Sequence, residues 1–450
     1  MIEFLLEKMR ANGGELGVAE PSRSCTHSEL IDRVVHWQQW LKDQHVPPGA
    51  VVTLESDYGI DAVALFLALI DNRNTIVPLS TDARAQHDAF VEIAEVEYRL
   101  NPSGTCQPTG RAAAHAMYAT LRERRHPGLV LFSSGSTGKP KAAVHDLRLL
   151  LEKFETPRHA YRTIVFLQLD HIGGVNTLLY ALSNGGAVIV PRDRSPKSVC
   201  DAIETRKATL LPTSPTFLNL LLLSGEHQRH DLSSLALITY GTEPMPASTL
   251  ERVAQTFPAI KLLQTYGMTE LGILRSQSRD SGSLWVRVGG EGYETKVVDN
   301  RLWIRARSAM LGYLNAPSPF DADGFMDTGD QVEVDGEWLR ILGRVSDIIN
   351  VGGSKVYPAE VESVLLGLDN VADVAVHGEP QPITGQMVVA TIKLREPEAL
   401  DQFKIRLRQY CAGRLSSYKV PVKIRLVDGP IHSQRYKRVR SGPATAEARN

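Results

Sequence analysis

The sequence has few cysteines and no excess of charge of either sign. Four cysteines occur in 450 residues, far apart in the chain and without a C-x-x-C pair. Neither a zinc site nor a disulfide framework is therefore indicated, and reduced thiols in the cytoplasm are the simpler interpretation. The formal net charge is -1, so we expect neither a basic surface for nucleic acid nor an acidic tail.

Long hydrophobic runs are also missing. The longest purely apolar run, residues 62–70, lies between Asp61 and Asp71 and is too short to span a bilayer. The N-terminal stretch is too charged and too short for a signal peptide. We therefore expect a soluble protein without a membrane partner. The chain shows no internal repeat or low-complexity linker, and its length suits about two to four domains.

Strand-like and helix-like segments alternate through most of the chain. The strands expected before residue 266 are at 51–54, 75–79, 129–132, 163–167, 187–190, 209–211, 235–240 and 260–265. Their alternation with helices predicts parallel α/β sheets. Residues 283–341 instead show short alternating segments between turn residues, which predict antiparallel β structure. A smaller α+β pattern follows, so we predict a large N-terminal domain at 1–344 and a small C-terminal domain at 345–450.

A polar loop follows the expected strand at 129–132. It contains hydroxyls, glycines and lysines: Ser133, Ser134, Gly135, Ser136, Thr137, Gly138, Lys139, Pro140 and Lys141. Glycine lets backbone N–H groups turn toward oxygens without a Cβ in the way, so the loop can donate to a polyphosphate. A flexible turn with solubilising lysines is the alternative. A Walker-type P-loop is excluded, because only two residues separate Gly135 from Gly138 and a proline follows Lys139.

Two further motifs carry groups that suit a nucleotide. Tyr266, Thr269 and Glu270 follow an expected strand, which is where α/β sheets place ligand loops. The tyrosine can stack on a purine, and the carboxylate beside a hydroxyl can hold Mg²⁺, although an ordinary polar turn would look the same. Asp330 and the permanently charged Arg344 could clamp the hydroxyls of a ribose or form an ordinary surface ion pair.

In this order, the motifs resemble those of the adenylate-forming superfamily, which includes acyl- and aryl-CoA synthetases, amino-acid adenylation domains and beetle luciferases. The resemblance extends over about residues 20 to 440. It implies that Glu270 binds Mg²⁺ and that Tyr266 packs on adenine. It also implies that Asp330 binds ribose with help from Arg344. The residues implied to bind ATP or AMP are Ser133, Ser134, Gly135, Ser136, Thr137, Gly138, Lys141, Gly241, Thr242, Tyr266, Gly267, Met268, Thr269, Asp330, Arg344 and Lys437.

The resemblance further implies a set of catalytic residues, namely Lys437, Glu270, Thr137 and Lys141. Lys437 is identified by its distance from residues 415–428, which follow the family closely, although Tyr436 stands where the family has glycine. Arg440 then also falls into register. A solvated basic tail is the alternative, in which case the catalytic lysine would be Lys419, Lys423 or Lys355.

An acyl pocket and a path for the thiol are implied as well. The residues implied for the acyl pocket are His171, Gly174, Tyr240, Gly241 and Leu271. The residues implied to line the tunnel for coenzyme A or a phosphopantetheine arm are Gly352, Gly353 and Lys355. Ser346 is the implied hinge about which a mobile C-terminal domain swings between two half-reactions.

The implied activity is that of an ATP-dependent carboxylate–CoA ligase, an acid–thiol ligase that uses ATP, Mg²⁺ and coenzyme A. A small-molecule carboxylic acid would give an acyl-adenylate, from which the pantetheine thiol would take the acyl group. Three alternatives stay open: loading of an acyl carrier protein, an amino-acid adenylation domain, and a non-catalytic nucleotide-binding relative. Asp170 keeps an amino-acid substrate open, although Ile172 stands where amino-acid-activating relatives place an aspartate. The sequence leaves aliphatic, aryl and amino acids undecided.

Overall fold

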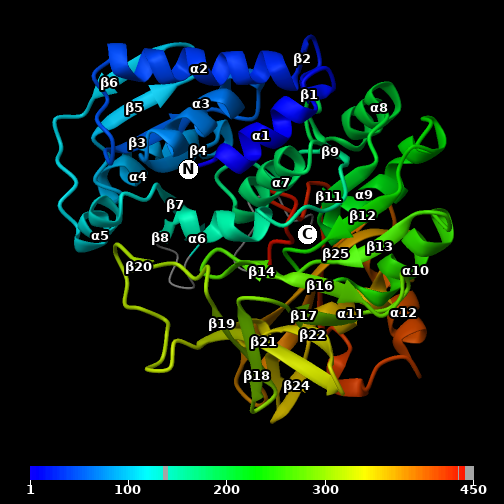
Figure 1. Cartoon of the computed structure of the whole chain (residues 1–450). Coiled ribbons are helices and arrows are strands. Elements are labelled where there is room, and N and C mark those ends of the chain that lie inside the picture. Colours follow the sequence, from blue (N-terminus) through cyan, green and yellow to red (C-terminus); the bar gives the residue numbers. More distant parts are fainter. Residues whose placement is uncertain (135–139, 434, 441–450) are drawn as a thin grey trace.

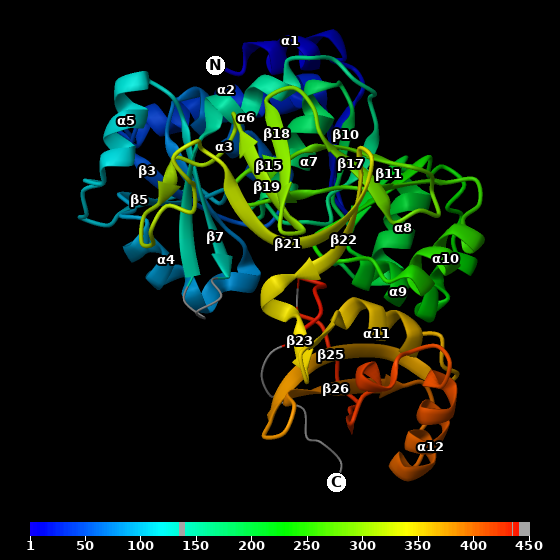
Figure 2. The same cartoon turned by 90° about the horizontal axis from the view of Figure 1, so that it is seen from below.

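A computed structural model describes residues 1–134, 140–433 and 435–440 (Figure 1). Turned by 90°, it shows a large N-terminal domain and a small C-terminal domain beneath it, joined just after β22 (Trp338–Arg344) (Figure 2). The predicted fold class is confirmed: α/β sheets, an antiparallel β part and a small α+β domain.

The first α/β sheet is parallel at its centre and antiparallel at its edges. Strand β3 pairs in parallel with β4 and β5, whereas β8 runs antiparallel to β7. Within the described residues, the strand order is β20-β8-β7-β4-β3-β5-β6. Every residue of β4 is buried, as expected for a parallel strand covered on both faces. The strands are β3 (Val51–Glu55), β4 (Thr75–Leu79), β5 (Tyr98–Asn101), β6 (Thr105–Pro108), β7 (Gly128–Ser134), β8 (Pro140–Asp146) and β20 (Gly312–Tyr313).

Helices cover this sheet with their apolar side chains. In α3 (Ile60–Asp71) only the two aspartates are not buried, which explains the apolar run at 62–70. Helix α2 (His27–Asp43) begins at a capping box, in which Thr26 and Glu29 bond each other's backbone N–H groups. No helix in the described part of the chain combines the length and apolar character needed to cross a bilayer. The remaining helices here are α1 (Glu3–Ala11), η1 (Thr81–Gln86), α4 (His87–Ile93), α5 (Ala116–Arg124), α6 (Leu147–Leu151) and η2 (Glu152–Phe154).

The second α/β sheet has the order β13-β12-β11-β9-β10-β1-β2 in the described chain, and only β2 is antiparallel to its neighbour. Its strand β9 ends at Ile164, although the apolar run predicted a strand to residue 167. Phe166 is buried by packing on Phe217 instead of by strand pairing. The strands are β1 (Leu16–Ala19), β2 (Ser24–Thr26), β9 (Arg162–Ile164), β10 (Ala187–Ile189), β11 (Leu210–Thr213), β12 (Leu237–Tyr240) and β13 (Lys261–Gln264). The helices are α7 (Ile172–Ser183), α8 (Pro196–Arg206), α9 (Pro215–Ser224), η3 (Glu226–Gln228) and α10 (Ala247–Thr256).

The predicted antiparallel region forms a sheet of its own, with the order β16-β17-β22-β21-β19-β18 in the described residues. Its register places Asp330 directly opposite Arg344. A short pair, β14 (Gly267–Met268) with β15 (Gly272–Ile273), precedes it. The other strands are β16 (Arg275–Ser278), β17 (Trp285–Gly289), β18 (Tyr293–Val298), β19 (Arg301–Ala306) and β21 (Met326–Asp335).

The C-terminal domain has its own sheet and its own apolar core. Val361 and Leu365 of α11 and Phe403 and Leu407 of α12 are fully buried against its strands. Figure 2 shows both helices beside β25 and β26. The elements are η4 (Val345–Asp347), β23 (Ile349–Val351), β24 (Ser354–Val356), α11 (Pro358–Leu365), β25 (Val371–Gln381), β26 (Gly385–Leu394), α12 (Leu400–Cys411), η5 (Ser417–Lys419) and β27 (Lys423–Leu426).

Candidate active site

A cavity of about 610 Å³ lies where the two domains meet. It is lined from the end of β7, from one face of α7, from the strand ends of β11, β12 and β13, and from the last described segment, residues 435–440. The carboxyl ends of parallel strands and domain boundaries are where ligand sites usually form. The cavity is therefore the candidate ligand site of this protein.

The polar loop at the end of β7 reaches this cavity through its described residues. Ser133 lines the cavity. Lys141, near the start of β8, places its ammonium 5.3 Å from the centre of the Tyr313 ring, although it is not part of the lining. The side chain of Ser134 lies outside the described structure, as do Gly135, Ser136, Thr137 and Gly138. Their phosphate-binding role stays a prediction.

Tyr266, Asp330 and Arg344 are brought together at one side of the cavity. The Tyr266 hydroxyl donates to Asp330 Oδ2 at 2.6 Å, and Arg344 Nε lies 3.7 Å from Asp330 Oδ1. Burial raises the pKa of the Asp330 carboxyl, while the hydrogen bond from Tyr266 and the charge of Arg344 oppose that shift. The ring of Tyr266 thus carries a hydroxyl that holds Asp330, a contact that the linear motifs did not predict.

Glu270 is a nearly buried carboxylate on the cavity wall. The Tyr313 hydroxyl donates to its Oε1 at 2.5 Å, and no hydrogen bond to its Oε2 is formed by the described residues. No cluster of three or more His, Cys, Asp or Glu side chains in the described ranges could hold a metal ion alone. Mg²⁺ keeps several ligands from water and substrate phosphates, so one free carboxylate oxygen fits a Mg²⁺ ion that arrives with a nucleotide.

The loop after β12 contributes Gly241, Thr242 and Glu243 to the lining. A Cβ at Gly241 would lie 2.8 Å from the Thr265 carbonyl oxygen, so only glycine fits there. The carboxylate of Glu243 already has partners within the protein, because Thr216 donates to its Oε1 from the backbone N–H and from the hydroxyl. Gly267, Met268 and Thr269, which precede Glu270, also line the cavity.

Lys437 enters the cavity from the C-terminal segment. Burial lowers its pKa to about 8, while the carboxylate of Glu243 opposes the shift and Arg435 and Arg344 add to it. The preceding Tyr436 packs on Phe166, with ring centres 5.3 Å apart. This packing argues against a solvated basic tail, which was the alternative interpretation of this stretch.

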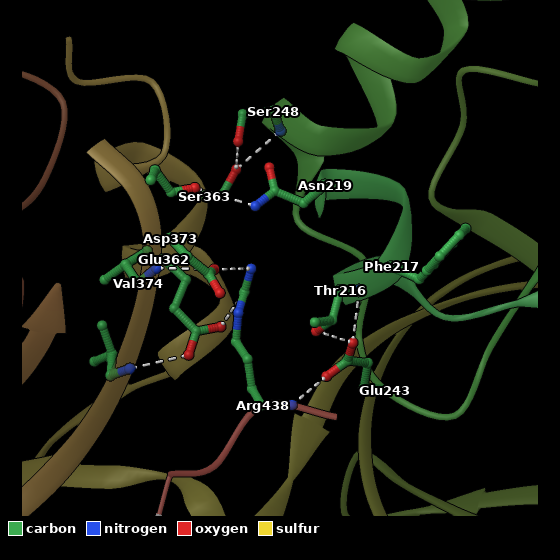
Figure 3. A network of polar contacts seen from close by, with 12 residues as sticks. Thr216, Phe217, Asn219, Glu243, Ser248, Glu362, Ser363, Asp373, Val374 and Arg438 are labelled. Atoms are coloured by element: carbon green, nitrogen blue, oxygen red, sulfur yellow. Dashed lines mark hydrogen bonds and ion pairs between the residues drawn. The ribbon is translucent and has the colours of Figure 1, made fainter. Parts of the chain in front are cut away.

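Arg438 anchors the same segment between the two domains (Figure 3). Its guanidinium pairs with Glu362 at 2.9 Å and with Asp373 at 3.4 Å, both in the C-terminal domain. Its backbone N–H donates to Glu243 Oε2 of the N-terminal domain at 3.1 Å. Arg440 also pairs with Glu362, at 2.7 Å. Sequence reasoning placed Arg440 in register but missed Arg438, because its partners are distant in the chain.

The residues expected in the acyl pocket divide into two groups. His171 and Gly241 line the cavity, whereas Gly174, Tyr240 and Leu271 do not. Gly174 is pressed against the chain itself, since a Cβ there would lie 1.9 Å from the Gln168 carbonyl oxygen. Tyr240 and Leu271 are buried in the apolar cores behind the wall. Burial lowers the pKa of His171 strongly, and the charges of Lys437 and Arg435 add to this shift.

Asp170 is not part of the cavity lining. Its Oδ2 accepts hydrogen bonds from the Ser80 hydroxyl at 2.6 Å and from Arg435 at 2.8 Å. Ile172, in contrast, does line the cavity. The structure therefore offers no carboxylate from this stretch to the amino group of an amino acid.

The residues implied for the thiol path lie apart from the cavity in this arrangement. Gly352 and Gly353 form the turn between β23 and β24 with positive φ angles of +57° and +85°, and Lys355 is exposed on β24. None of the three lines the cavity. Ser346 lies in η4 between the domains, where its hydroxyl donates to Asp347 at 2.9 Å.

Several residues that line the cavity were missed by sequence reasoning. At the end of the cavity that is distant from Lys437, the lining contains aromatic, amide and basic side chains: Lys153, Arg158, Tyr161, Asn176, Tyr180 and Arg275. A signal existed for Lys153, which stands between Leu151 and Phe154 in an apolar stretch. A lysine in an apolar stretch either extends its ammonium to the surface or is buried for a functional reason.

The chain is similar to known proteins in its sequence and in its fold. Over 328 residues the chain is 30% identical to an indoleacetate–CoA ligase of Aromatoleum aromaticum; the match takes in 67% of this chain and 64% of that enzyme. The chain thus spans less than two thirds of the length of this relative.

Two solved structures share the fold. An anthranilate CoA ligase in complex with anthranoyl-AMP superposes with a TM-score of 0.83 at 21% identity, over 97% of this chain and 95% of that chain. The o-succinylbenzoate CoA synthetase of Bacillus subtilis, in complex with its acyl-adenylate, gives 0.76 at 21% identity, over 97% and 96%.

The sequence also matches two family descriptions in succession. Residues 91–314 match the AMP-binding enzyme family, and residues 360–434 match the AMP-binding enzyme C-terminal domain. The two matches follow the division of the structure into its two domains. The chain belongs to the adenylate-forming superfamily of AMP-binding enzymes.

Proposed function

We propose that this protein is an ATP-dependent carboxylate–CoA ligase that works through an acyl-adenylate. One observation carries the proposal. A single cavity collects Glu270, the pair of Asp330 and Tyr266, and Lys437, although these residues come from three separate parts of the chain. The amino-acid adenylation alternative is weaker, because Asp170 is engaged by Arg435 outside the lining.

The first half-reaction moves negative charge from the carboxylate to pyrophosphate. A carboxylate oxygen of the acid attacks the α-phosphorus of ATP, and the bond from that phosphorus to the bridging oxygen of the β-phosphate breaks. Lys437 would contact the carboxylate and the α-phosphate, because a flexible ammonium can follow charge as it moves. Glu270 would hold Mg²⁺, which neutralises phosphate charge when it is bound. Positioned donors of this kind are typically worth about 3–4 kcal/mol each.

Asp330 and Tyr266 would bind the adenosine part. Asp330 would accept hydrogen bonds from the ribose hydroxyls, with its orientation held by Tyr266 and Arg344. The ring of Tyr266 would pack on adenine. Gly241 lets the backbone pass close to the nucleotide without a Cβ. These roles explain why the buried carboxylate of Asp330 and the phenol of Tyr266 are kept together beside the exposed guanidinium of Arg344.

The second half-reaction needs a different domain arrangement. The thiol sulfur would attack the acyl carbonyl carbon, and AMP would leave. We place the domain boundary after Arg344 and the hinge at Ser346, so that rotation brings Gly352, Gly353 and Lys355 to the cavity while Lys437 withdraws. Coenzyme A is the proposed acceptor, with a carrier-protein phosphopantetheine as the alternative. Cytoplasmic location is proposed from the scarcity of cysteines.

Acid-dependent exchange of pyrophosphate into ATP tests this function. We expect exchange with Mg²⁺ and at least one carboxylic acid from a panel of aliphatic, aryl and amino acids. Thioester formation is then compared between coenzyme A and a pantetheinylated carrier protein, which separates the two acceptors. Exchange that is absent with every acid, in a folded protein that binds ATP, would overturn the proposal.

A further inference from the structure

We propose that the acid activated here carries a second anionic group, bound at the far end of the cavity by Lys153, Arg158 and Arg275. This inference rests on the proposed function, because it assumes that the reacting carboxylate lies near Lys437. It names a substrate class: dicarboxylic acids, or acids with another anion distant from the carboxylate that reacts.

Helix α7 sets the distance between the two ends. Its residues Ile172, Asn176 and Tyr180 all line the cavity, so one face of the helix runs along it. The N-terminal end of this face is near Lys437, since the charge of Lys437 acts on the adjoining His171. With a rise of 1.5 Å per residue, Asn176 and Tyr180 lie roughly 6 and 12 Å further along the axis than Ile172.

The ammonium of Lys153 lies beside the side chain of Asn176. Its ammonium donates to Asn176 Oδ1 at 2.5 Å and to the Ile273 carbonyl oxygen at 2.9 Å. Neither acceptor carries a charge, and no described carboxylate forms an ion pair with Lys153. A partly buried ammonium without a counter-ion is costly, which is why lysines in protein interiors are normally paired.

Two further cations surround the same place. Burial lowers the pKa of Lys153 to about 7, and the charges of Arg158 and Arg275 add to the shift. Neither guanidinium forms a hydrogen bond or ion pair with a carboxylate of the described chain. The acidic residues that line the cavity are at its nucleotide end: Glu243, Glu270, Asp330 and Asp347.

This arrangement is explained by an anion that comes with the substrate. Three cations at one end of a cavity repel one another, and an incoming carboxylate would relieve that repulsion and supply the missing counter-ion. The cavity lining also contains apolar side chains, including Phe154, Leu167 and Ile273. They suit an aliphatic or aryl spacer between two anions separated by roughly 6 to 12 Å.

Calorimetry can test the second anion separately from catalysis. Adipate, suberate, sebacate and para-phenylenediacetate are each titrated against their monomethyl esters, with an α,β-methylene ATP analogue present so that no reaction occurs. For at least one pair we expect the diacid to bind roughly tenfold or more tightly than its ester, because hydrogen bonds to charged groups are the stronger ones. The Lys153→Met variant should lose most of this preference.

Two arginine variants extend the test, and one lysine variant is its control. Arg158→Gln and Arg275→Gln change exposed side chains, so they should fold and still reduce the preference for the diacid. Lys207→Met removes an exposed lysine paired with Asp231 on the surface and should leave the preference unchanged. Equal affinity for diacid and ester across the panel would overturn the inference. Pyrophosphate exchange with the same acids decides the proposed function independently, since a monocarboxylate could support exchange while the anion preference is absent.

Discussion

The buried guanidinium of Arg438 lies 2.9 Å from Glu362 Oε2, with only 3% and 0% of the two side chains exposed. Figure 3 shows that Arg438 reaches α11 of the C-terminal domain while its backbone contacts Glu243 of the N-terminal domain. Direct contacts between the domains lie nearby, where the Ser248 N–H donates to Ser363 at 3.0 Å. The pair therefore links the segment that carries Lys437 to the position of the whole C-terminal domain.

Removing the negative partner of this pair should destabilise the protein. Burial would raise the pKa of Glu362, but Arg440 and Arg438 outweigh it and hold that pKa at about 2. Glu362→Gln would remove the carboxylate that two largely buried cations share, leaving Arg438 with Asp373 at 3.4 Å and Arg440 with Asp347 at 3.8 Å. We expect a loss of about 3–5 kcal/mol in denaturant unfolding at pH 7. A carboxylate with a lowered pKa contributes stability above its ordinary pKa, and that contribution disappears as the pH falls through about 2.

The difference between the wild type and Glu362→Gln should accordingly shrink in acid. Glu360→Gln is the matched control on the same helix. It breaks a pair with Lys419 in which the carboxylate is 43% exposed, so the expected change is under about 1 kcal/mol. Similar losses for the two variants would show that burial of the pair does not matter.

Glu270→Gln should reduce pyrophosphate exchange by roughly 10²–10³-fold without unfolding the protein. The variant keeps the shape of the side chain and removes the charge proposed to hold Mg²⁺. Tyr313→Phe removes only the hydroxyl that donates to Glu270, and a smaller loss, roughly tenfold, is expected. If Glu270→Gln exchanged pyrophosphate at the wild-type rate with Mg²⁺, the proposed metal ligand would be wrong.

Lys437→Ala should abolish formation of the acyl-adenylate and still allow coenzyme A to react with acyl-adenylate that is supplied. The ammonium is proposed to act only in the first half-reaction. Lys419→Ala removes a lysine of the same domain that pairs with Glu360 and should have a mild effect on both steps. Normal adenylation by Lys437→Ala would move the catalytic role to another lysine, with Lys419, Lys423 and Lys355 as the candidates.

The pH dependence of adenylation should also report Lys437. Because burial lowers the pKa of this lysine to about 8, kcat/KM for ATP should fall as the pH rises through about 8, when the free enzyme loses the charge. The corresponding decline in kcat should lie at higher pH, since bound phosphates favour the charged ammonium. Lys437→Arg should lack this decline near pH 8 even if its activity is low, because arginine stays charged.

Ser346→Pro should slow thioester formation more than adenylation. Proline restricts its own φ angle and the conformation of the residue before it, so rotation at this position would be impeded. Adenylation is proposed to use the arrangement in which Lys437 lines the cavity. Ser346→Ala, which removes only the hydroxyl bonded to Asp347, is the control and should leave both rates close to the wild type. Equal loss of both steps in the proline variant would indicate damage other than a blocked hinge.

Much of the proposed nucleotide site could be predicted because its motifs are local. Tyr266, Thr269 and Glu270 follow one strand, and Asp330 and Arg344 lie on two neighbouring strands of one hairpin. The residue types at the end of a strand are visible in the sequence, and so is the chemistry they can perform. The carboxyl edge of an α/β sheet then determines where Tyr266, Thr269 and Glu270 gather.

Other features required contacts that the linear sequence does not show. The bond between Tyr266 and Asp330 joins residues 64 positions apart, and the bond between Arg438 and Glu362 joins residues 76 apart. Gly174, Tyr240 and Leu271 match the family pattern, yet packing places them behind the cavity wall. Whether a side chain faces a cavity or the core behind it depends on the elements packed against it, which periodicity alone cannot resolve.

The sequence by itself determined the order of the α/β, antiparallel and α+β regions, because hydrophobic period and turn residues are local properties. It also led to the proposed nucleotide chemistry, since each motif carries its own donors and acceptors. Only the tertiary structure decided that Lys437 reaches the cavity, held by Tyr436 and Arg438. The same holds for Lys153, because the lack of a carboxylate around an ammonium depends on every element that surrounds it in space.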